Sequence, residues 1–175
     1  MNVVKQRQLK QLSLAIALVA SATLAHAATS TANLAVSATV TANCSISATS
    51  ALAFGAYDPV VANASTDLDG TGTISVTCTS GAPATITLGE GANANTGSTA
   101  AAPLRRMTDG SSNYISYSLY SDSGRTVIWG NDATVDVATT GTGAAEAHTV
   151  YGRIASGQNV PAGSYNDTVV ATVTF

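Results

Sequence analysis

Residues 32–40 read ANLAVSATV, and apolar side chains occupy every second position of this stretch. Alternation with a period of two is typical of a β-strand that buries one face. The intervening positions are polar except for Ala35. We expect this strand either to complete its own sheet or to leave and complete the sheet of a neighbouring molecule. The side chains that it would insert are Ala32, Leu34, Val36, Ala38 and Val40.

The first 27 residues have the pattern of a secretory signal peptide. A basic start up to Lys10 precedes an apolar stretch from Leu12 to Leu24, and Ala25-His26-Ala27 is a small-x-small cleavage signal. The apolar stretch is shorter than the roughly 20 residues of a membrane-spanning helix. We therefore expect residues 1–27 to be removed during export; the alternative is a retained membrane anchor.

The charge of the remaining chain excludes several classes of partner. Residues 28–175 contain four arginines, no lysine and ten acidic residues, which gives a net charge of −6. Nucleic-acid binding needs clustered basic residues to neutralise phosphates, so no nucleic-acid partner is expected. Attraction to an anionic membrane surface is equally unsupported.

Composition and periodicity favour an all-β fold in one domain. The chain after residue 27 is rich in Ala, Thr, Ser, Gly and Val, and no helix-length segment shows a 3.6-residue period. Many short strands bounded by turn residues are typical of an antiparallel β-sandwich. Exposed loops are expected at 89–102 and 139–147, and a turn at 67–70. Strands are expected at 32–40, 44–48, 52–57, 71–78, 84–88, 104–107, 114–120, 126–129, 149–154 and 165–175.

The two cysteines, Cys44 and Cys78, predict one disulfide. An even pair in an exported protein is normally oxidised. Closing a loop of about 35 residues stabilises the fold by roughly 4 kcal/mol in the chain-entropy model. A zinc site would need further ligands, and His148 is the single histidine after residue 27. We expect His148 at an ordinary surface position and no metal or other cofactor.

No catalytic constellation emerges, so we do not expect an enzyme or a small-molecule substrate. A Ser-His-Asp arrangement could use only His148. The Asp67-x-Asp69-Gly70 sequence lacks the closing glutamate of a calcium loop, because position twelve is Cys78. Arg105, Arg106 and Arg125 are expected to be solvated or paired with Asp109, Asp122 or Asp132. Trp129 is expected in the core, and Asp167 either at the sandwich rim, bonded by a loop, or simply exposed.

Three segments resemble the spore coat protein U domain, a family that includes subunits of archaic chaperone–usher (Csu-type) pili. They are GTISVTC (72–78), the stretch 105–130 that begins RRMTDG, and the stretch 149–175 that ends TVVATVTF. The C-terminal block is the most specific of the three. It matches at Gly163, Tyr165, Asp167, Val169 and Phe175, and departs at Ala171, where a larger aliphatic residue is common.

The resemblance implies an incomplete immunoglobulin-like β-sandwich of six strands plus an N-terminal donor strand. The implied organisation is a signal peptide (1–27), a donor segment (28–41) and a pilin sandwich (42–175). A periplasmic chaperone would lend the missing strand, and at the outer-membrane usher the donor segment of the next subunit would replace it. The receiving groove would be bordered by Val169, Ala171, Val173 and Phe175.

Three functional hypotheses follow, and the sequence does not separate the first two. The leading one is a structural pilus subunit on the cell surface that forms a head-to-tail polymer and supports adhesion and biofilm formation. The second is a spore-coat structural protein built from the same domain. The third is a surface-binding adhesin module, although tip subunits of the family have two domains and 148 residues make one.

Overall fold

The computed structural model describes residues 27–175, so the signal-peptide prediction lies outside the described residues except for Ala27. The described chain divides into residues 27–38 and a body, Thr39–Phe175. Residues 27–43 belong to no strand, and the side chains of Leu34 and Val36 are 87% and 85% exposed. The strand predicted at 32–40 is therefore not formed in the single chain. No helix of the described residues is long and apolar enough to span a membrane.

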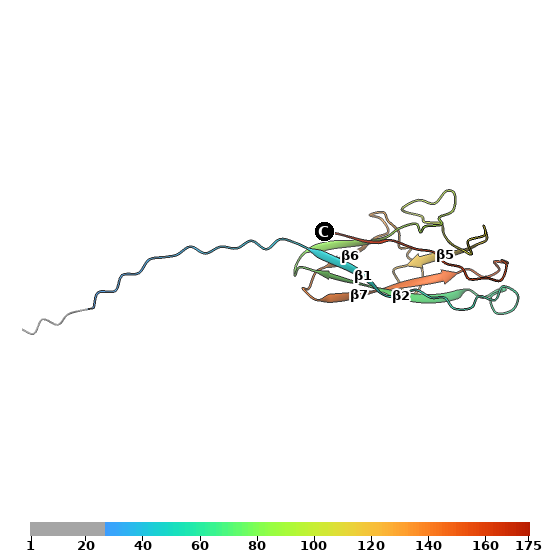
Figure 1. Cartoon of the computed structure of the whole chain (residues 1–175), viewed down its shortest axis with the longest axis horizontal. Helices are drawn as coiled ribbons and strands as arrows, with labels where there is room; N and C mark the ends of the chain where they lie inside the picture. Colours follow the sequence, from blue (N-terminus) through green and yellow to red (C-terminus); the bar gives the residue numbers. More distant parts are fainter. Residues whose placement is uncertain (1–26) are drawn as a thin grey trace, which may run out of the picture. The chain divides into compact units, whose positions relative to one another are not determined.

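The body is built from two antiparallel sheets, which confirms the predicted all-β sandwich (Figure 1). The five-stranded sheet consists, in spatial order, of β1 (Cys44–Ser50), β2 (Leu68–Cys78), β7 (Ala145–Ile154), β5 (Tyr114–Tyr120) and β4 (Arg105–Thr108). The three-stranded sheet consists of β6 (Val137–Thr140), β3 (Pro83–Leu88) and β8 (Ala171–Thr174). The body has eight strands, whereas the resemblance implied six. The sequence pattern predicted a strand at 104–107, which corresponds to β4, but none at β6.

The core lies between the sheets, where strand alternation directs every second side chain inward. In β5 the buried residues are Ile115, Tyr117 and Leu119, as the sequence pattern predicts. Trp129 is 1% exposed, and its indole N–H donates to the carbonyl of Ile86 at 2.9 Å. A buried indole needs such a partner, because an unpaired N–H in the core is costly.

The segment 52–57 was predicted as a strand, and this prediction is wrong. After β1 the chain crosses the inner face of β2 and β7, where the side chains of Leu52 and Phe54 lie over Gly72 and Gly152. A Cβ atom at Gly152 would lie 2.8 Å from carbons of both side chains. Gly72 and Gly152 therefore leave space on the inner face of the sheet that a side chain would occupy, and Leu52 and Phe54 fill this space. We call these two glycines the glycine floor.

Three other local predictions are wrong. In two of them, residues that favour turns lie in strands because they pair with a neighbouring strand. The expected turn at 67–70 lies largely within β2, and Asp69 pairs with Arg153 of β7 in register and through a two-bond ion pair of 2.8 and 3.0 Å. The expected loop at 139–147 contains the end of β6 and the start of β7. The expected strand at 126–129 reduces to one bridge, between Ile128 and Tyr120.

The predicted environments of Arg105, Arg125 and His148 are also wrong. Arg105 is 1% exposed and donates to three backbone carbonyls, those of Leu88, Gly89 and Trp129. Arg125 forms its ion pair with Asp69, at 3.2 Å. His148 is half-buried on β7, and its Nε2 has no hydrogen-bond partner among the described residues.

A disulfide joins Cys44 and Cys78, as predicted. The two cysteines face each other in the register of β1 and β2, so the bond ties the first residue of β1 to the last residue of β2. Next to it, the backbones of Asn43 and Thr79 hydrogen-bond at 2.9 Å. The edge strand β1 is thereby fixed at the point where the chain enters the body.

The glycine floor can be tested by substitution. We predict that Gly152→Ala lowers the free energy of unfolding by about 1–3 kcal/mol, because Leu52 and Phe54 must move to admit a methyl group. Urea denaturation of the mature chain measures this. Gly89→Ala is the control: its Cβ would have its closest contact at 3.4 Å, and we expect a change within about 0.5 kcal/mol. Equal effects of the two substitutions would contradict the packing described.

Candidate functional site

The two sheets each end in an unpaired strand on the same side of the body. β1 is the last strand of the five-stranded sheet and pairs only with β2 among the described strands. β8 is the last strand of the three-stranded sheet and pairs only with β3. β1 and β8 are in contact across the sheets. The sandwich is therefore open along one side, between these two strands.

The open edge of β8 can be identified residue by residue. The carbonyls of Val170 and Thr168 accept hydrogen bonds from Gly89 and Ala92, at 2.8 and 3.0 Å. In an antiparallel pair, alternate residues direct both backbone groups to the same neighbour. The residues between and beyond them, Val169, Ala171 and Val173, therefore direct their N–H and C=O groups away from β3. No described residue bonds to them from that side.

A cavity of about 510 Å³ lies along this open edge. Ile46 and Ala48 of β1 form one wall, and Val169 and Ala171 form the other. Its floor consists of core side chains from both sheets: Ile74, Leu88, Tyr117, Leu119 and Val150. The apolar interior and the unpaired backbone groups thus meet in one groove.

A second cavity, of about 850 Å³, continues the groove toward the loop that follows residue 57. Leu52, Phe54, Met107 and Tyr165 line both cavities, so they form a ridge between them. The far part is lined by Tyr57, Val60, Val160 and Pro161, among others. The first cavity is mainly apolar, and the second has both polar and apolar walls. A groove that runs along an open strand and offers successive pockets has the form that a β-strand requires, since the side chains on one face of a strand repeat every second residue.

A polar cluster fixes the β8 wall of the groove. Asp167 accepts hydrogen bonds from the hydroxyl of Tyr117, at 2.6 Å, and from the side-chain amide of Asn93, at 3.0 Å. Tyr117 belongs to β5 in the other sheet, and Asn93 to the loop at 89–102. Gly91 makes room for the carboxylate, because a Cβ there would clash with it. The rim position expected for Asp167 is thus present, with a bond to this loop.

Burial shifts the ionisation of two side chains of this region. The pKa of Tyr117 is raised, first by burial and then by the hydrogen bond to Asp167, so the phenol stays protonated and donates. Burial lowers the pKa of Arg105 to about 10, against weaker opposing attraction from the carboxylates of Asp167 and Glu90. Arg105 is still a cation at neutral pH, and its three carbonyl acceptors offset part of the desolvation cost.

The predicted acceptor residues fall into two groups. Val169 and Ala171 line the first cavity. Val173 packs against the core beyond the cavity, and Phe175 is 56% exposed. The predicted donor residues lie in or next to the segment without strand structure, and Val40 is 81% exposed. Their roles as acceptor and donor remain predictions.

Sequence reasoning missed that Leu52 and Phe54 form part of the groove. Leu52, Phe54 and Tyr117 come from elements far apart in the chain, so no local pattern brings them together. One signal was available: LAFGAY (52–57) is a continuous apolar run without alternation of polar and apolar residues. Such a run indicates burial on both faces but does not distinguish a strand from a segment that packs on a sheet.

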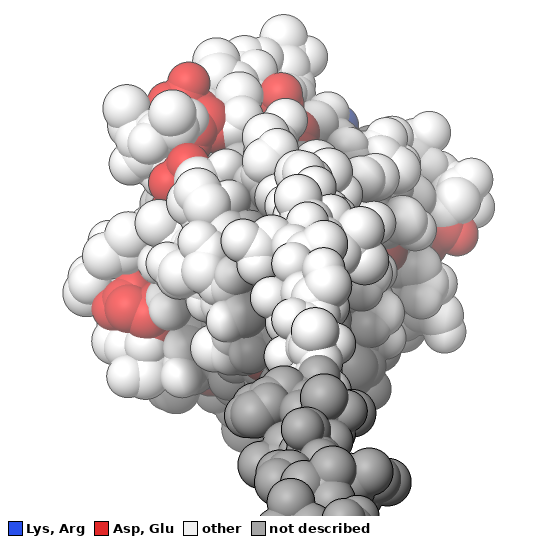
Figure 2. Space-filling model, turned by 90° about the vertical axis from the view of Figure 1, so that its left-hand side faces the viewer, with Lys and Arg blue, Asp and Glu red and all other residues white. Residues whose placement is uncertain are grey.

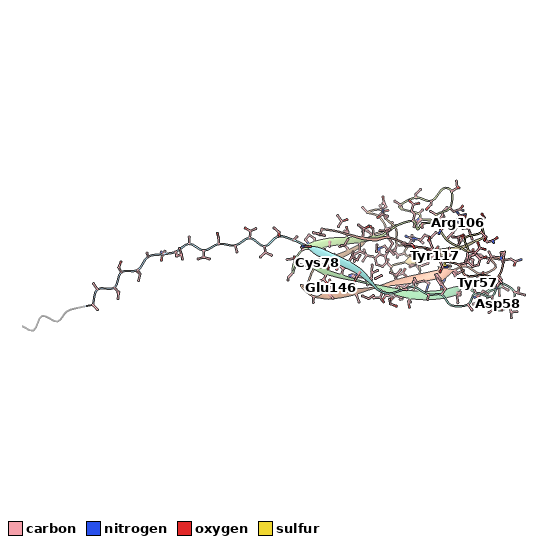
Figure 3. The ribbon with its side chains drawn as sticks, in the orientation of Figure 1. Tyr57, Asp58, Cys78, Arg106, Tyr117 and Glu146 are labelled. Carbon is pink, nitrogen blue, oxygen red and sulfur yellow. A yellow bond between two sulfur atoms is a disulfide. The ribbon has the colours of Figure 1, made fainter. Side chains whose placement is uncertain are left out.

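Among residues 27–175 no three potential metal-ligating side chains lie together. On the face drawn in Figure 2 most of the surface is uncharged, and acidic residues form separate patches. Tyr117 and Arg106, both labelled in Figure 3, lie on the paired strands β5 and β4; Tyr117 is buried and Arg106 is half-buried.

The spore coat protein U domain model matches residues 30–172 of this chain. The chain belongs to this family. The match begins before the sandwich and so includes the alternating segment at 32–40. A relative named Protein U, from Myxococcus xanthus, is 48% identical over 127 residues, which cover 71% of each chain.

The fold is similar to that of a chain in the crystal structure of the CsuC–CsuE chaperone–tip adhesion subunit pre-assembly complex from archaic chaperone-usher Csu pili of Acinetobacter baumannii. The TM-score is 0.56 and the sequence identity 20%. The match covers 78% of the present chain and 40% of the Csu chain, so the present chain spans less than half of that protein's length. At this identity the match shows the fold.

The polar cluster yields a test. We predict that Tyr117→Phe lowers the free energy of unfolding by about 1–3 kcal/mol, because Asp167 keeps its half-buried carboxylate and loses a donor. Tyr114→Phe, on the same strand and 37% exposed, is the control and should change stability by less than about 0.5 kcal/mol. Chemical denaturation measures both. If the double variant Tyr117→Phe/Asp167→Asn shows additive losses, the bond does not couple the two residues.

Proposed function

We propose that this protein is a structural subunit that polymerises by donor-strand complementation. The observation that carries the proposal is the groove between β1 and β8, where unpaired backbone groups of Val169, Ala171 and Val173 lie beside apolar pockets. A strand added there would gain main-chain hydrogen bonds from the edge and side-chain burial from the pockets. The same chain carries a segment with the required alternation, at 32–40.

We call the contact between a donated strand and the groove of another molecule a joint. Burial of the donor side chains would contribute a large part of its association free energy. Full burial of a Val or Leu side chain contributes about 1.5–3 kcal/mol. Leu34, Val36 and Val40 are each more than 80% exposed in the single chain, so they have this free energy still to gain. Because the donor and the groove are different surfaces, the contact is head-to-tail and propagates as an open filament.

A monomer of this design is prone to association, and this supports a chaperone requirement. An open sheet edge next to an apolar groove invites unspecific pairing. We propose a periplasmic chaperone that covers the groove and an outer-membrane usher that exchanges it for the next subunit's segment. The product would be a pilus at the cell surface, where it would support adhesion and biofilm formation.

A spore-coat structural role is the second candidate, and the relationship with Protein U favours it. The sequence identity of 48% is far higher than the 20% identity with the Csu chain. Strand exchange between subunits could build a coat as well as a filament. Electron microscopy of cells with and without the gene separates the two: loss of surface filaments supports the pilus, and loss of a spore layer supports the coat.

Two complementary variants test the strand exchange itself. We predict that Val36→Asp cannot donate, because an unpaired carboxylate would enter an apolar pocket. We predict that Ala171→Trp cannot accept, because the indole fills the first cavity. Each variant alone should give no polymer, whereas a mixture should give dimers, since the groove of Val36→Asp and the donor segment of Ala171→Trp are intact. Native mass spectrometry measures this.

The control for the donor register is Ser37→Asp, whose side chain points to the opposite face of the strand. It should polymerise like the unmodified chain. Equal polymerisation of Val36→Asp and Ser37→Asp would show that the register is wrong. Normal fibres from a chain that lacks residues 28–40 would contradict strand exchange altogether.

A further inference from the structure

A loop at one end of the body presents two valines to solvent. Val60 and Val61 are both 77% exposed, and they lie in the turn that follows Tyr57. In Figure 3 the labels of Asp58 and Cys78 stand at opposite ends of the body. We call the end formed by residues 58–66 the Asp58 end, and the end where the chain enters at Asn43 the Cys44 end.

The exposure of the valines is fixed by hydrogen bonds. The carboxylate of Asp58 accepts from the N–H groups of Val60 and Val61, at 2.9 and 3.1 Å. Asn63 is 5% exposed, accepts from the N–H of Asp58 and donates to the carbonyl of Thr66. These hydrogen bonds keep Val60 and Val61 exposed. In a loop without them, the two valine side chains could turn inward and bury apolar surface. Such a surface indicates a partner.

The loop adjoins the groove. Val60 lines the second cavity, next to Pro161 and Tyr165, whereas Val61 does not. The loop is thus the outer rim of the groove at the Asp58 end. A molecule that emerges from the groove at this end passes beside the loop that carries Val60 and Val61.

The direction of the donor strand decides which end it leaves by. β8 runs toward the Cys44 end, because Thr174 pairs with Thr85 near the start of β3. The terminus marked C in Figure 1 lies at that end. Every strand pair in the body is antiparallel, and antiparallel pairing is slightly more stable per residue. A donor that is antiparallel to β8 carries its C-terminal residues out at the Asp58 end.

The tether between donor and body is short. Four residue steps separate Val40, the last donor side chain, from Cys44, which the disulfide fixes to the body. A fully extended chain covers at most about 3.3–3.6 Å per residue, hence roughly 14 Å here. Cys44 of the donating molecule must therefore lie within roughly 14 Å of the position that its Val40 takes at the Asp58 end of the accepting one.

We propose that the loop with Val60 and Val61 is a docking surface for the Cys44 end of a second copy of this chain. This inference rests on the proposed strand exchange and adds a second contact to each joint. The facing surface is built from the turns beside the disulfide, including residues 79–81 and 141–144. Gly81 N donates to Gly141 O at 2.8 Å and Gly143 N to Cys78 O at 3.0 Å, so these turns are also held in place.

Val61 allows the test to be separated from the groove, and Val127 supplies a matched control. Val127 is 51% exposed on a loop where Asp122 accepts from its N–H at 2.8 Å, so its local chemistry is the same. The mature chain is refolded with a photo-crosslinking residue, p-benzoylphenylalanine, at position 61 or 127. After irradiation of the polymer, mass spectrometry identifies the linked peptides. We expect position 61 to link to residues 79–81 or 141–144 of another copy, and position 127 not to.

The isosteric variants Val61→Thr and Val127→Thr give an independent readout. Burial of one valine corresponds to about a tenfold effect on association, so Val61→Thr should slow polymer growth by several-fold while Val127→Thr does not. A peptide of residues 28–43 should stop growth of both equally. Failure of the peptide to stop growth would contradict strand exchange. A peptide that works, together with equal growth of the two variants or links from position 61 to other surfaces, would overturn the docking proposal alone.

Discussion

The unpaired backbone edge of β8 is the constraint on which the rest of the structure depends. Backbone N–H and C=O groups must be paired or hydrated, and here they border an interior of apolar side chains. Water in the groove would hydrogen-bond to the backbone groups but would not bury the apolar side chains. An apolar side chain in the groove would bury them but would leave the backbone groups without hydrogen bonds. An extended strand meets both needs, which is why the open side of this sandwich points to a strand as its ligand.

A sandwich that lacks a closing strand needs other ties between its sheets. Arg105 of β4 holds the carbonyls of Leu88 and Trp129, and so fastens the end of β3 to the other sheet. Asp167 and Tyr117 form a second tie at the groove wall. The disulfide fixes β1 from the opposite side. The groove is thus framed by polar and covalent bonds, and its walls do not rely on the apolar contacts that a ligand would supply.

The sequence predicted those parts of the fold that depend on local pattern. The alternation in β3 and β5 was sufficient to place their inward side chains, and the cysteine pair was sufficient to indicate the disulfide. The fate of Leu52 and Phe54 was not predictable, because it depends on glycines in two other strands. Arg105 was misread for a similar reason. Nothing near it in sequence shows that loops at residues 89 and 129 bring three carbonyls to one point.

Part of the groove was predictable from the sequence. The Val169 and Ala171 wall follows from alternation, since one register fixes a whole face, whereas the donor role of residues 32–40 is still a prediction. The pockets depend on Met107, Tyr165 and the crossing at 52–57, which only the assembled sheets define. The sequence shows that only four residue steps separate Val40 from Cys44. This short tether limits how two molecules can be arranged only once the structure shows which residues lie at each end of the body.

The scarcity of basic residues has a consequence for resistance to proteases. Exposed, unstructured segments are where proteases normally cut, and residues 28–43 contain no lysine, arginine, aspartate or glutamate. Trypsin-like enzymes, which require a basic residue before the scissile bond, therefore have no cleavage site in this exposed segment. The four arginines of the body are held by carbonyls or carboxylates. Composition alone thus protects residues 28–43 from a whole class of proteases, and the potential sites in the body lie on side chains that the fold holds in place.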